Sequence, residues 1–225
     1  MPIHSSVPVP LRDISWTRRA FCRGASVFRE GDRAELIYLL DSGLIKLSRD
    51  VDSLRKTIVR LVRPGELIGD RALNGVMHQR YTAETLDDGA VWEAGRREFQ
   101  AVCDASPRAL NWVTSQLEQR LAEVERRVEL ITYERVEIRL LKLLLELAEA
   151  TVVSANLPAE NIQMPLSQWE IAQMIGSTRE TASTHLNLLG RRDLLRLSRR
   201  QIEVVSLEAL REALRSDDRA LAAHP

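Results

Sequence analysis

Three patterns of hydrophobic and polar positions divide the chain, and the first is typical of short strands. Between about residues 20 and 98, short apolar runs alternate with glycine-containing turns. The runs at 36–40 and 44–47, with a glycine turn between them, indicate a strand, a turn and a second strand. Further β-rich runs occupy residues 57–62 and 81–92. Many short strands at this spacing predict a small β-barrel or roll.

The second pattern is helical and begins after Pro107. Residues 108–150 contain no glycine or proline, and apolar residues recur at steps of three and four. Part of this stripe keeps a strict 4-3-4-3 rhythm with charged flanks, which predicts a coiled-coil seam with a second copy of the chain. Packing against the chain's own barrel is the alternative. The predicted dimer-interface residues are Leu117, Leu121, Val124, Val128 and Ile131.

The third pattern, within residues 166–189, predicts a helix-turn-helix. Ser167 is a favourable N-cap, and Glu170 three residues later completes a capping box. Gly176 suits the left-handed conformation of the turn. Thr178 can then cap a second helix, whose first turn would meet base edges in the DNA major groove.

The start of this second helix has the chemistry to read DNA. Arg179 can bind guanine through two hydrogen bonds, and Glu180 can accept one from cytosine N4. An ordinary helical hairpin with solvated charges is the alternative. Residues 194–205 then predict a β-hairpin of the wing type. The predicted DNA-binding residues are Ser167, Gln168, Ser177, Thr178, Arg179, Glu180, Ser183, Thr184, Arg199 and Arg200.

Charge and composition support a DNA-binding role and a cytoplasmic location. The chain has 32 Lys and Arg residues against 32 Asp and Glu residues, yet residues 176–202 carry six arginines against two acidic residues, a local balance of +4. Such a local basic face can contact phosphates. A composition of 44% hydrophobic and 28% charged residues is typical of a globular protein. No secretory signal or membrane-length apolar run is visible, so we expect a cytoplasmic protein.

Catalytic and metal chemistry are not indicated. The chain has no recognisable nucleophile–base set, phosphate loop or metal cluster, so we expect that it is not an enzyme and needs no cofactor. Cys22 and Cys103 are too few for a zinc site or a cysteine-bound iron–sulfur cluster. They leave open a thiol switch or simple burial.

The order of these elements resembles the cyclic-AMP receptor protein and fumarate–nitrate regulator (CRP/FNR) superfamily over about residues 20–206. The resemblance implies an α+β fold with an N-terminal cyclic-nucleotide-binding-type β-roll, a long dimerisation helix and a C-terminal winged helix-turn-helix. It also implies a homodimer that senses a small molecule, binds two half-sites on double-stranded DNA and contacts RNA polymerase. The motifs that carry the resemblance are Phe28-Arg29-Glu30-Gly31-Asp32, residues 38–47, Pro64-Gly65-Glu66-Leu67-Ile68-Gly69 and residues 175–181.

The resemblance also bears on the effector. Gly69-Asp70, Arg80-Tyr81 and Val124-Glu125 stand where the cyclic-AMP receptor has its ribose, phosphate and adenine contacts, and their differences argue against cyclic AMP. The chain is similar to the cyanobacterial global nitrogen regulator, which senses 2-oxoglutarate, in having an Arg and a Glu five residues apart on the long helix. The predicted effector-binding residues are Ile68, Gly69, Asp70, Arg71, Arg80, Tyr81, Arg120, Val124 and Glu125.

A dicarboxylate needs guanidinium partners, so Arg80 and Arg120 are the expected ligands of 2-oxoglutarate. The alternatives are a different effector, such as a cyclic nucleotide, a redox thiol or haem, and no effector at all. In the last case Arg120 and Glu125 would be charged residues that flank the seam.

The predicted organisation has five segments. They are a flexible arm over residues 1–16, a sensor roll over 17–106, a dimerisation helix over 107–134, a winged helix-turn-helix over 135–206 and a short C-terminal helix over 207–225.

Overall fold

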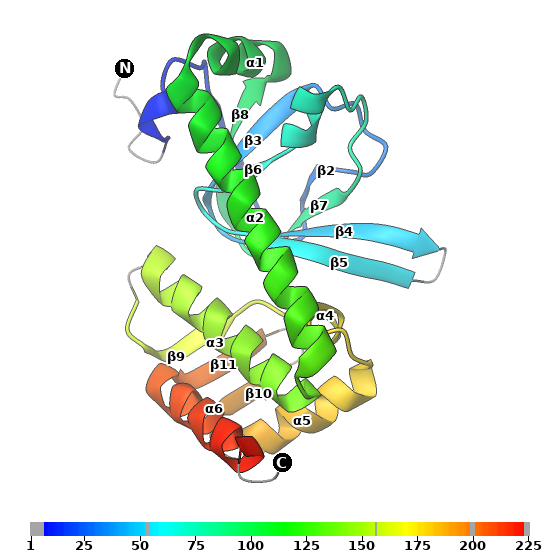
Figure 1. Cartoon of the computed structure of the whole chain (residues 1–225), viewed down its shortest axis with the longest axis vertical. Coiled ribbons are helices and arrows are strands. Elements are labelled where there is room, and N and C mark those ends of the chain that lie inside the picture. Colours follow the sequence, from blue (N-terminus) through cyan, green and yellow to red (C-terminus); the bar gives the residue numbers. More distant parts are fainter. Residues whose placement is uncertain (1–6, 53–54, 156, 199–200, 223–225) are drawn as a thin grey trace. The chain divides into compact units, whose positions relative to one another are not determined.

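The computed structural model describes residues 7–52, 55–155, 157–198 and 201–222 (Figure 1). The chain divides into two compact units, residues 1–124 and 125–225. Helix α2 (Pro107–Tyr133) belongs to both, because it begins in the first unit and ends in the second.

Two antiparallel four-stranded sheets form the roll of the first unit. In spatial order, the first sheet contains β1 (Thr17–Phe21), β8 (Gly89–Gly95), β3 (Leu36–Ser42) and β6 (Leu67–Ile68). The second sheet contains β2 (Ser26–Phe28), β7 (Thr82–Thr85), β4 (Ile45–Asp52) and β5 (Arg55–Val62).

The first sheet is buried on both faces, which explains the unbroken apolar run at residues 36–40. Side chains alternate between the faces of a strand. Tyr38 and Leu40 join a core cluster that both sheets share. Ile37 and Leu39 join a second cluster, formed with α1 (Arg96–Ala105) and the start of α2. The roll and the first turns of α2 therefore have a common core.

The flexible arm predicted over residues 1–16 is wrong for residues 7–16. A 3-10 turn, η1 (Val9–Leu11), lies in this segment. Val7, Leu11 and Ile14 are buried in the cluster beneath α1, and the Trp16 Nε1 donates a hydrogen bond to the Leu11 carbonyl at 2.9 Å. Their spacing of four and three residues matches one face of a helix, but Pro8 and Pro10 interrupt the segment and indicated a loose arm. Residues 1–6 lie outside the described residues.

The second unit contains a three-stranded antiparallel sheet and helices α3 to α6 (Figure 1). The sheet order is β10 (Leu195–Ser198), β11 (Gln201–Ser206) and β9 (Glu160–Met164). The helices are α3 (Val136–Ala155), α4 (Gln168–Met174), α5 (Arg179–Arg191) and α6 (Leu207–Ala222).

The structure confirms the predicted fold class of β-roll, long helix and winged helix-turn-helix. Strand β9 was not predicted, because the hydrophobic pattern indicates no strand before residue 194 in this unit. Its Ile162 and Met164 are buried, and the strand pairs with β11. Among the described residues, no helix combines the length and apolar character needed to cross a membrane.

Candidate nucleic-acid interface

Helices α4 and α5 form a helix-turn-helix with capped starts. The Ser167 backbone N donates to Glu170 Oε2 at 2.8 Å, and the Glu170 backbone N donates to Ser167 Oγ at 3.3 Å. The Thr181 backbone N donates to Thr178 Oγ1 at 3.2 Å. Both predicted caps are confirmed. Since these hydroxyls hold the helix ends, α5 begins at a fixed residue with Arg179 and Glu180 in its first turn.

The turn between the two helices contacts the end of α2, within the second unit. Gly176 has φ +62°, and a Cβ on it would lie 3.3 Å from Cδ1 of Ile131. One turn earlier on α2, Arg127 Nη2 donates to the Gln173 carbonyl at 3.1 Å, and burial lowers the pKa of this guanidinium. The end of the predicted dimer helix is thus in direct contact with the turn that positions α5.

We expect Gly176→Ala to lower the free energy of unfolding by roughly 1–2 kcal/mol, because alanine is strained at this positive φ. The added methyl also meets Ile131. Urea denaturation of the full chain measures the change. Gly190→Ala is the matched control, since Gly190 lies in α5 and a Cβ there meets only the Leu195 carbonyl at 3.7 Å. Equal stability of the two variants would contradict the strained turn.

The first turns of α5 present an exposed polar face. Arg179 and Glu180 are exposed, and neither side chain forms a hydrogen bond or ion pair with another described residue. Positions 179, 180, 183 and 184 share one face of the helix by their spacing. Ser183 is half-buried and its Oγ accepts from Asn187 Nδ2 at 3.4 Å, whereas the exposed Thr184 Oγ1 donates to the Glu180 carbonyl at 3.0 Å. Arg179 and Glu180 are therefore the side chains best placed to contact an outside partner.

The remaining predicted DNA-binding residues are less prominent or cannot be placed. Gln168 at the start of α4 and Ser177 in the turn are half-buried. Arg199 and Arg200, at the tip of the predicted wing, lie outside the described residues.

The predicted hairpin is observed as β10 and β11, but the local positive charge is smaller than the sequence count implied. Arg196 Nη1 lies 2.5 Å from Glu203 Oε1 and donates to Asn161 Oδ1 at 3.1 Å. Arg192 Nη1 lies 3.9 Å from Glu137 Oε1. The partners Glu203, Asn161 and Glu137 all lie outside residues 176–202, so the charge count over that range did not include them.

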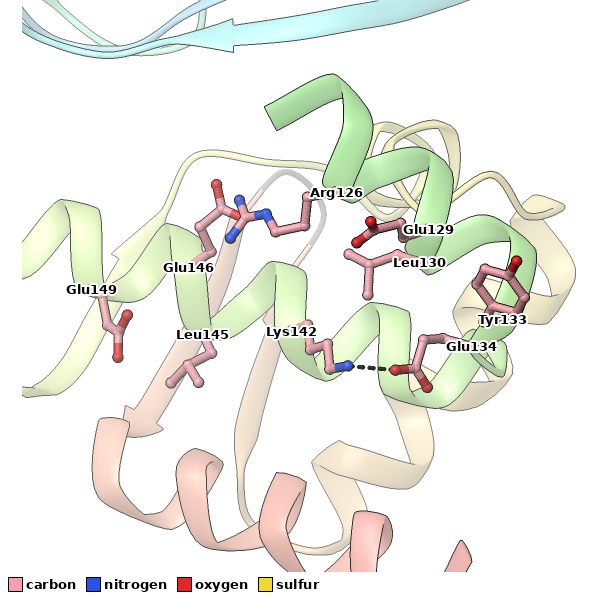
Figure 2. Close-up of a pocket in the computed structure, with 9 residues that line it drawn as sticks. All are labelled: Arg126, Glu129, Leu130, Tyr133, Glu134, Lys142, Leu145, Glu146 and Glu149. Atoms are coloured by element: carbon pink, nitrogen blue, oxygen red, sulfur yellow. Dashed lines mark hydrogen bonds and ion pairs between the residues drawn. The ribbon is translucent and has the colours of Figure 1, made fainter. Parts of the chain in front are cut away.

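The end of α2 and helix α3 enclose a groove of about 600 Å³ (Figure 2). Leu130 and Leu145 give it an apolar part. Two ion pairs cross it, Arg126 Nη2 to Glu146 Oε2 at 2.8 Å and Lys142 Nζ to Glu134 Oε1 at 2.5 Å. Such partly exposed ion pairs contribute little to stability. Together with the hydrogen bond from Arg127 to Gln173, they connect the end of α2 to helices α3 and α4.

The predicted seam of α2 is uncovered in a single chain. Its five apolar side chains recur at the 4-3-4-3 spacing, and they would expose a continuous apolar stripe to water. The exposed fractions are 44% for Leu117, 59% for Leu121, 58% for Val124, 58% for Val128 and 46% for Ile131.

The predicted effector region holds an ion-pair cluster between the roll and the first half of α2, within the first unit. Arg120 Nη1 lies 2.6 Å from Asp70 Oδ2, and its Nη2 donates to the Leu67 carbonyl. Arg60 Nη2 donates to the same carbonyl at 3.3 Å, and its Nη1 lies 3.2 Å from Glu66 Oε2. We call these four charged residues and this carbonyl the roll–helix cluster.

Burial acts on both charge types in the roll–helix cluster. It lowers the pKa of Arg60, and the nearby charge of Arg120 lowers that pKa further. Burial raises the pKa of Glu66, opposed by the positive charge of Arg60. Neither Arg60 nor Glu66 was predicted as a site residue, although the lone arginine in the β-rich run 57–62 was a usable signal.

The other predicted effector residues do not join this cluster. Arg80 is exposed and has no hydrogen bond or ion pair with a described residue. The Arg71 guanidinium lies 6.0 Å from the ring centroid of the half-buried Tyr81. Ile68 is buried in the core between the sheets. Val124 and Glu125 are exposed, and the division between the two units falls between them.

Two observations concern the alternative sensing chemistries. Cys22 is exposed, whereas Cys103 is buried and burial raises the pKa of its thiol, which disfavours the reactive thiolate. In the part of the chain that the structure describes, no group of three or more His, Cys, Asp or Glu residues is arranged to hold a metal ion.

Each of the two units contains a segment that matches a known domain family. A cyclic nucleotide-binding domain matches residues 18–106, and a Crp-like helix-turn-helix domain matches residues 138–213. The global nitrogen regulator of Synechococcus elongatus is 29% identical over 195 residues, covering 84% of this chain and 86% of that protein. The cyclic AMP receptor protein of Thermus thermophilus is 25% identical over 195 residues, covering 87% of each.

A solved structure has a similar fold. A CRP-family transcriptional regulator of Thermus thermophilus has a TM-score of 0.71 and 26% sequence identity, covering 86% of this chain and 95% of that one.

Proposed function

Because this chain belongs to the CRP/FNR superfamily of transcription regulators, we propose that it regulates transcription as a homodimer that binds two half-sites on double-stranded DNA. The observation that carries this function is the start of α5. Its first turn is fixed by the Thr178 cap and presents Arg179 and Glu180 with no partner among the described residues. A recognition helix uses this end in the major groove.

The apolar seam of α2 supports the homodimer. A parallel coiled coil would cover all five exposed seam residues at once. Two copies of α5 in a symmetric dimer would then meet successive major grooves, roughly 34 Å apart. Contact with RNA polymerase follows from the family resemblance and is part of the same proposal.

Binding to DNA can be tested directly with the purified full chain. Fluorescence anisotropy on a pool of labelled genomic fragments should show binding whose affinity falls linearly with salt concentration on logarithmic axes, since arginine–phosphate contacts release counterions. Absence of salt-dependent binding would contradict the proposed function.

The predicted binding of 2-oxoglutarate by Arg80 and Arg120 has its own test. Arg120 already contacts the Asp70 carboxylate, so the dicarboxylate would have to displace Asp70. Calorimetric titration with 2-oxoglutarate, using Arg120→Ala as the control, would support this effector if saturable heat is seen only in the parent chain. Cyclic AMP is the comparison compound.

A further inference from the structure

The roll–helix cluster contains its own carboxylates. Its two guanidinium groups, Arg60 and Arg120, converge on one carbonyl oxygen, that of Leu67. The carboxylates of Glu66 and Asp70 balance their two positive charges. The side chains of all four are largely shielded from water, with exposed fractions of 9% for Asp70 and 15–20% for the others. Charges that are shielded from water interact strongly, so removing one of the carboxylates would leave a strong local positive potential.

The turn after β6 determines where Asp70 lies. Gly69 has φ +80°, and a Cβ on it would lie 2.9 Å from the Leu36 carbonyl, so the turn requires glycine. The chain then enters the 3-10 turn η2 (Asp70–Asn74), with Asp70 as its first residue and its carboxylate against Arg120. The turn that follows β6 therefore places the Asp70 carboxylate against Arg120 of α2.

Removing the Asp70 carboxylate would change the site into an anion site. Arg60 and Arg120 would then share the Glu66 carboxylate and the Leu67 carbonyl, while the nearby Glu123 carboxylate is paired with Arg63 at 3.6 Å. Arg120 Nε is also buried and lacks a hydrogen-bond partner among the described residues. Guanidinium groups with unused donors bind carboxylates in bidentate fashion.

We infer that Asp70 is an internal ligand of Arg120 that takes the place of a carboxylate effector, so that specific DNA binding by this chain requires no small molecule. The inference rests on the proposed function. A tethered group acts at a high effective concentration, which gives Asp70 an advantage over free metabolites. The contact would keep α2 in one position on the roll, and α2 in turn contacts the turn before α5.

The test compares the parent chain with Asp70→Ala and Asp70→Asn. Each full-length protein is unfolded in urea, dialysed and refolded to remove small molecules. A DNA site is first selected with parent protein in the presence of both 2-oxoglutarate and cyclic AMP, so that a site is obtained whether or not these compounds are needed. Asp41→Asn is the matched control, because Asp41 also pairs with an arginine of the roll, Arg18, at 2.8 Å.

We expect the stripped parent chain and Asp41→Asn to bind the selected site equally well, with or without either compound. Asp70→Ala should bind roughly 5- to 150-fold more weakly, the range typical of a lost allosteric contact. Millimolar formate or acetate, at constant ionic strength, should restore its binding. Asp70→Asn should also bind DNA more weakly, and formate or acetate should not restore its binding, because the amide group still occupies the space of the carboxylate. If thermal melting shows that Asp70→Ala is unfolded, Asp70→Asn takes its place in the test.

Two results would overturn the inference alone. One is a stripped parent chain that binds its site only after 2-oxoglutarate or cyclic AMP is added. The other is an Asp70 variant that folds and binds like the parent. A parent chain that binds no DNA under any of these conditions would instead overturn the proposed function, and the inference with it.

Discussion

We expect the replacement of Arg179 with alanine to lower the affinity for the specific DNA site by about 1–3 kcal/mol, a factor of 5 to 150, and to relax the preference at one base pair. The reason is geometric: Arg179 is the first residue of α5, exposed and unpaired within the described part of the chain. An arginine at this position can donate two hydrogen bonds to guanine, and alanine cannot.

The measurement is anisotropy on the selected site and on variants changed at one base pair at a time. Arg191→Ala is the matched control, because Arg191 is an exposed arginine at the other end of the same helix and has no partner among the described residues. It should weaken binding to all sequences similarly, as loss of a phosphate contact would, or have no effect. Unchanged discrimination in Arg179→Ala would show that α5 does not read bases through this residue.

If the proposed dimer forms through the seam of α2, placing charges in the seam should separate it into single chains. The double variant Leu121→Glu, Val128→Glu places four like charges, two from each copy, within the predicted coiled coil, where apolar residues are required. We expect light scattering to report a mass near that of one chain, 25.5 kDa, in place of twice that value for the parent. DNA affinity should fall by roughly 10²- to 10⁴-fold, since linked half-site binding is lost.

Val59→Glu is the control for the seam experiment, because Val59 is an exposed apolar residue on β5, 39% exposed, and lies outside the seam. This variant should keep the mass of the parent. A parent chain that is already monomeric, or a double variant that still dimerises, would show that the seam is not the interface.

Local patterns in the sequence were sufficient to predict the DNA-reading elements. Ser167 and Glu170 are three residues apart, so their reciprocal hydrogen bonds are visible as a capping box. Gly176 likewise indicated the turn, because a turn with a positive φ favours glycine and this preference is visible in a single residue. The long helix likewise follows from a repeating spacing along one segment.

Contacts between distant residues could not be predicted in this way. Asp70 and Arg120 are 50 positions apart, and their shared acceptor is the backbone carbonyl of Leu67, which carries no side-chain signature. The resemblance placed both residues near an effector but did not indicate that they pair with each other. Arg196 was similarly counted as a free positive charge, because its contacts with Glu203 and Asn161 depend on the sheet.

Selection of bound fragments from genomic DNA tests the central claim most directly. A homodimer with two copies of α5 predicts an enriched inverted repeat whose half-site centres lie one turn, about 10–10.5 base pairs, apart. Enrichment of no sequence, or of a single half-site without a symmetric partner, would contradict a dimer that reads DNA with two recognition helices.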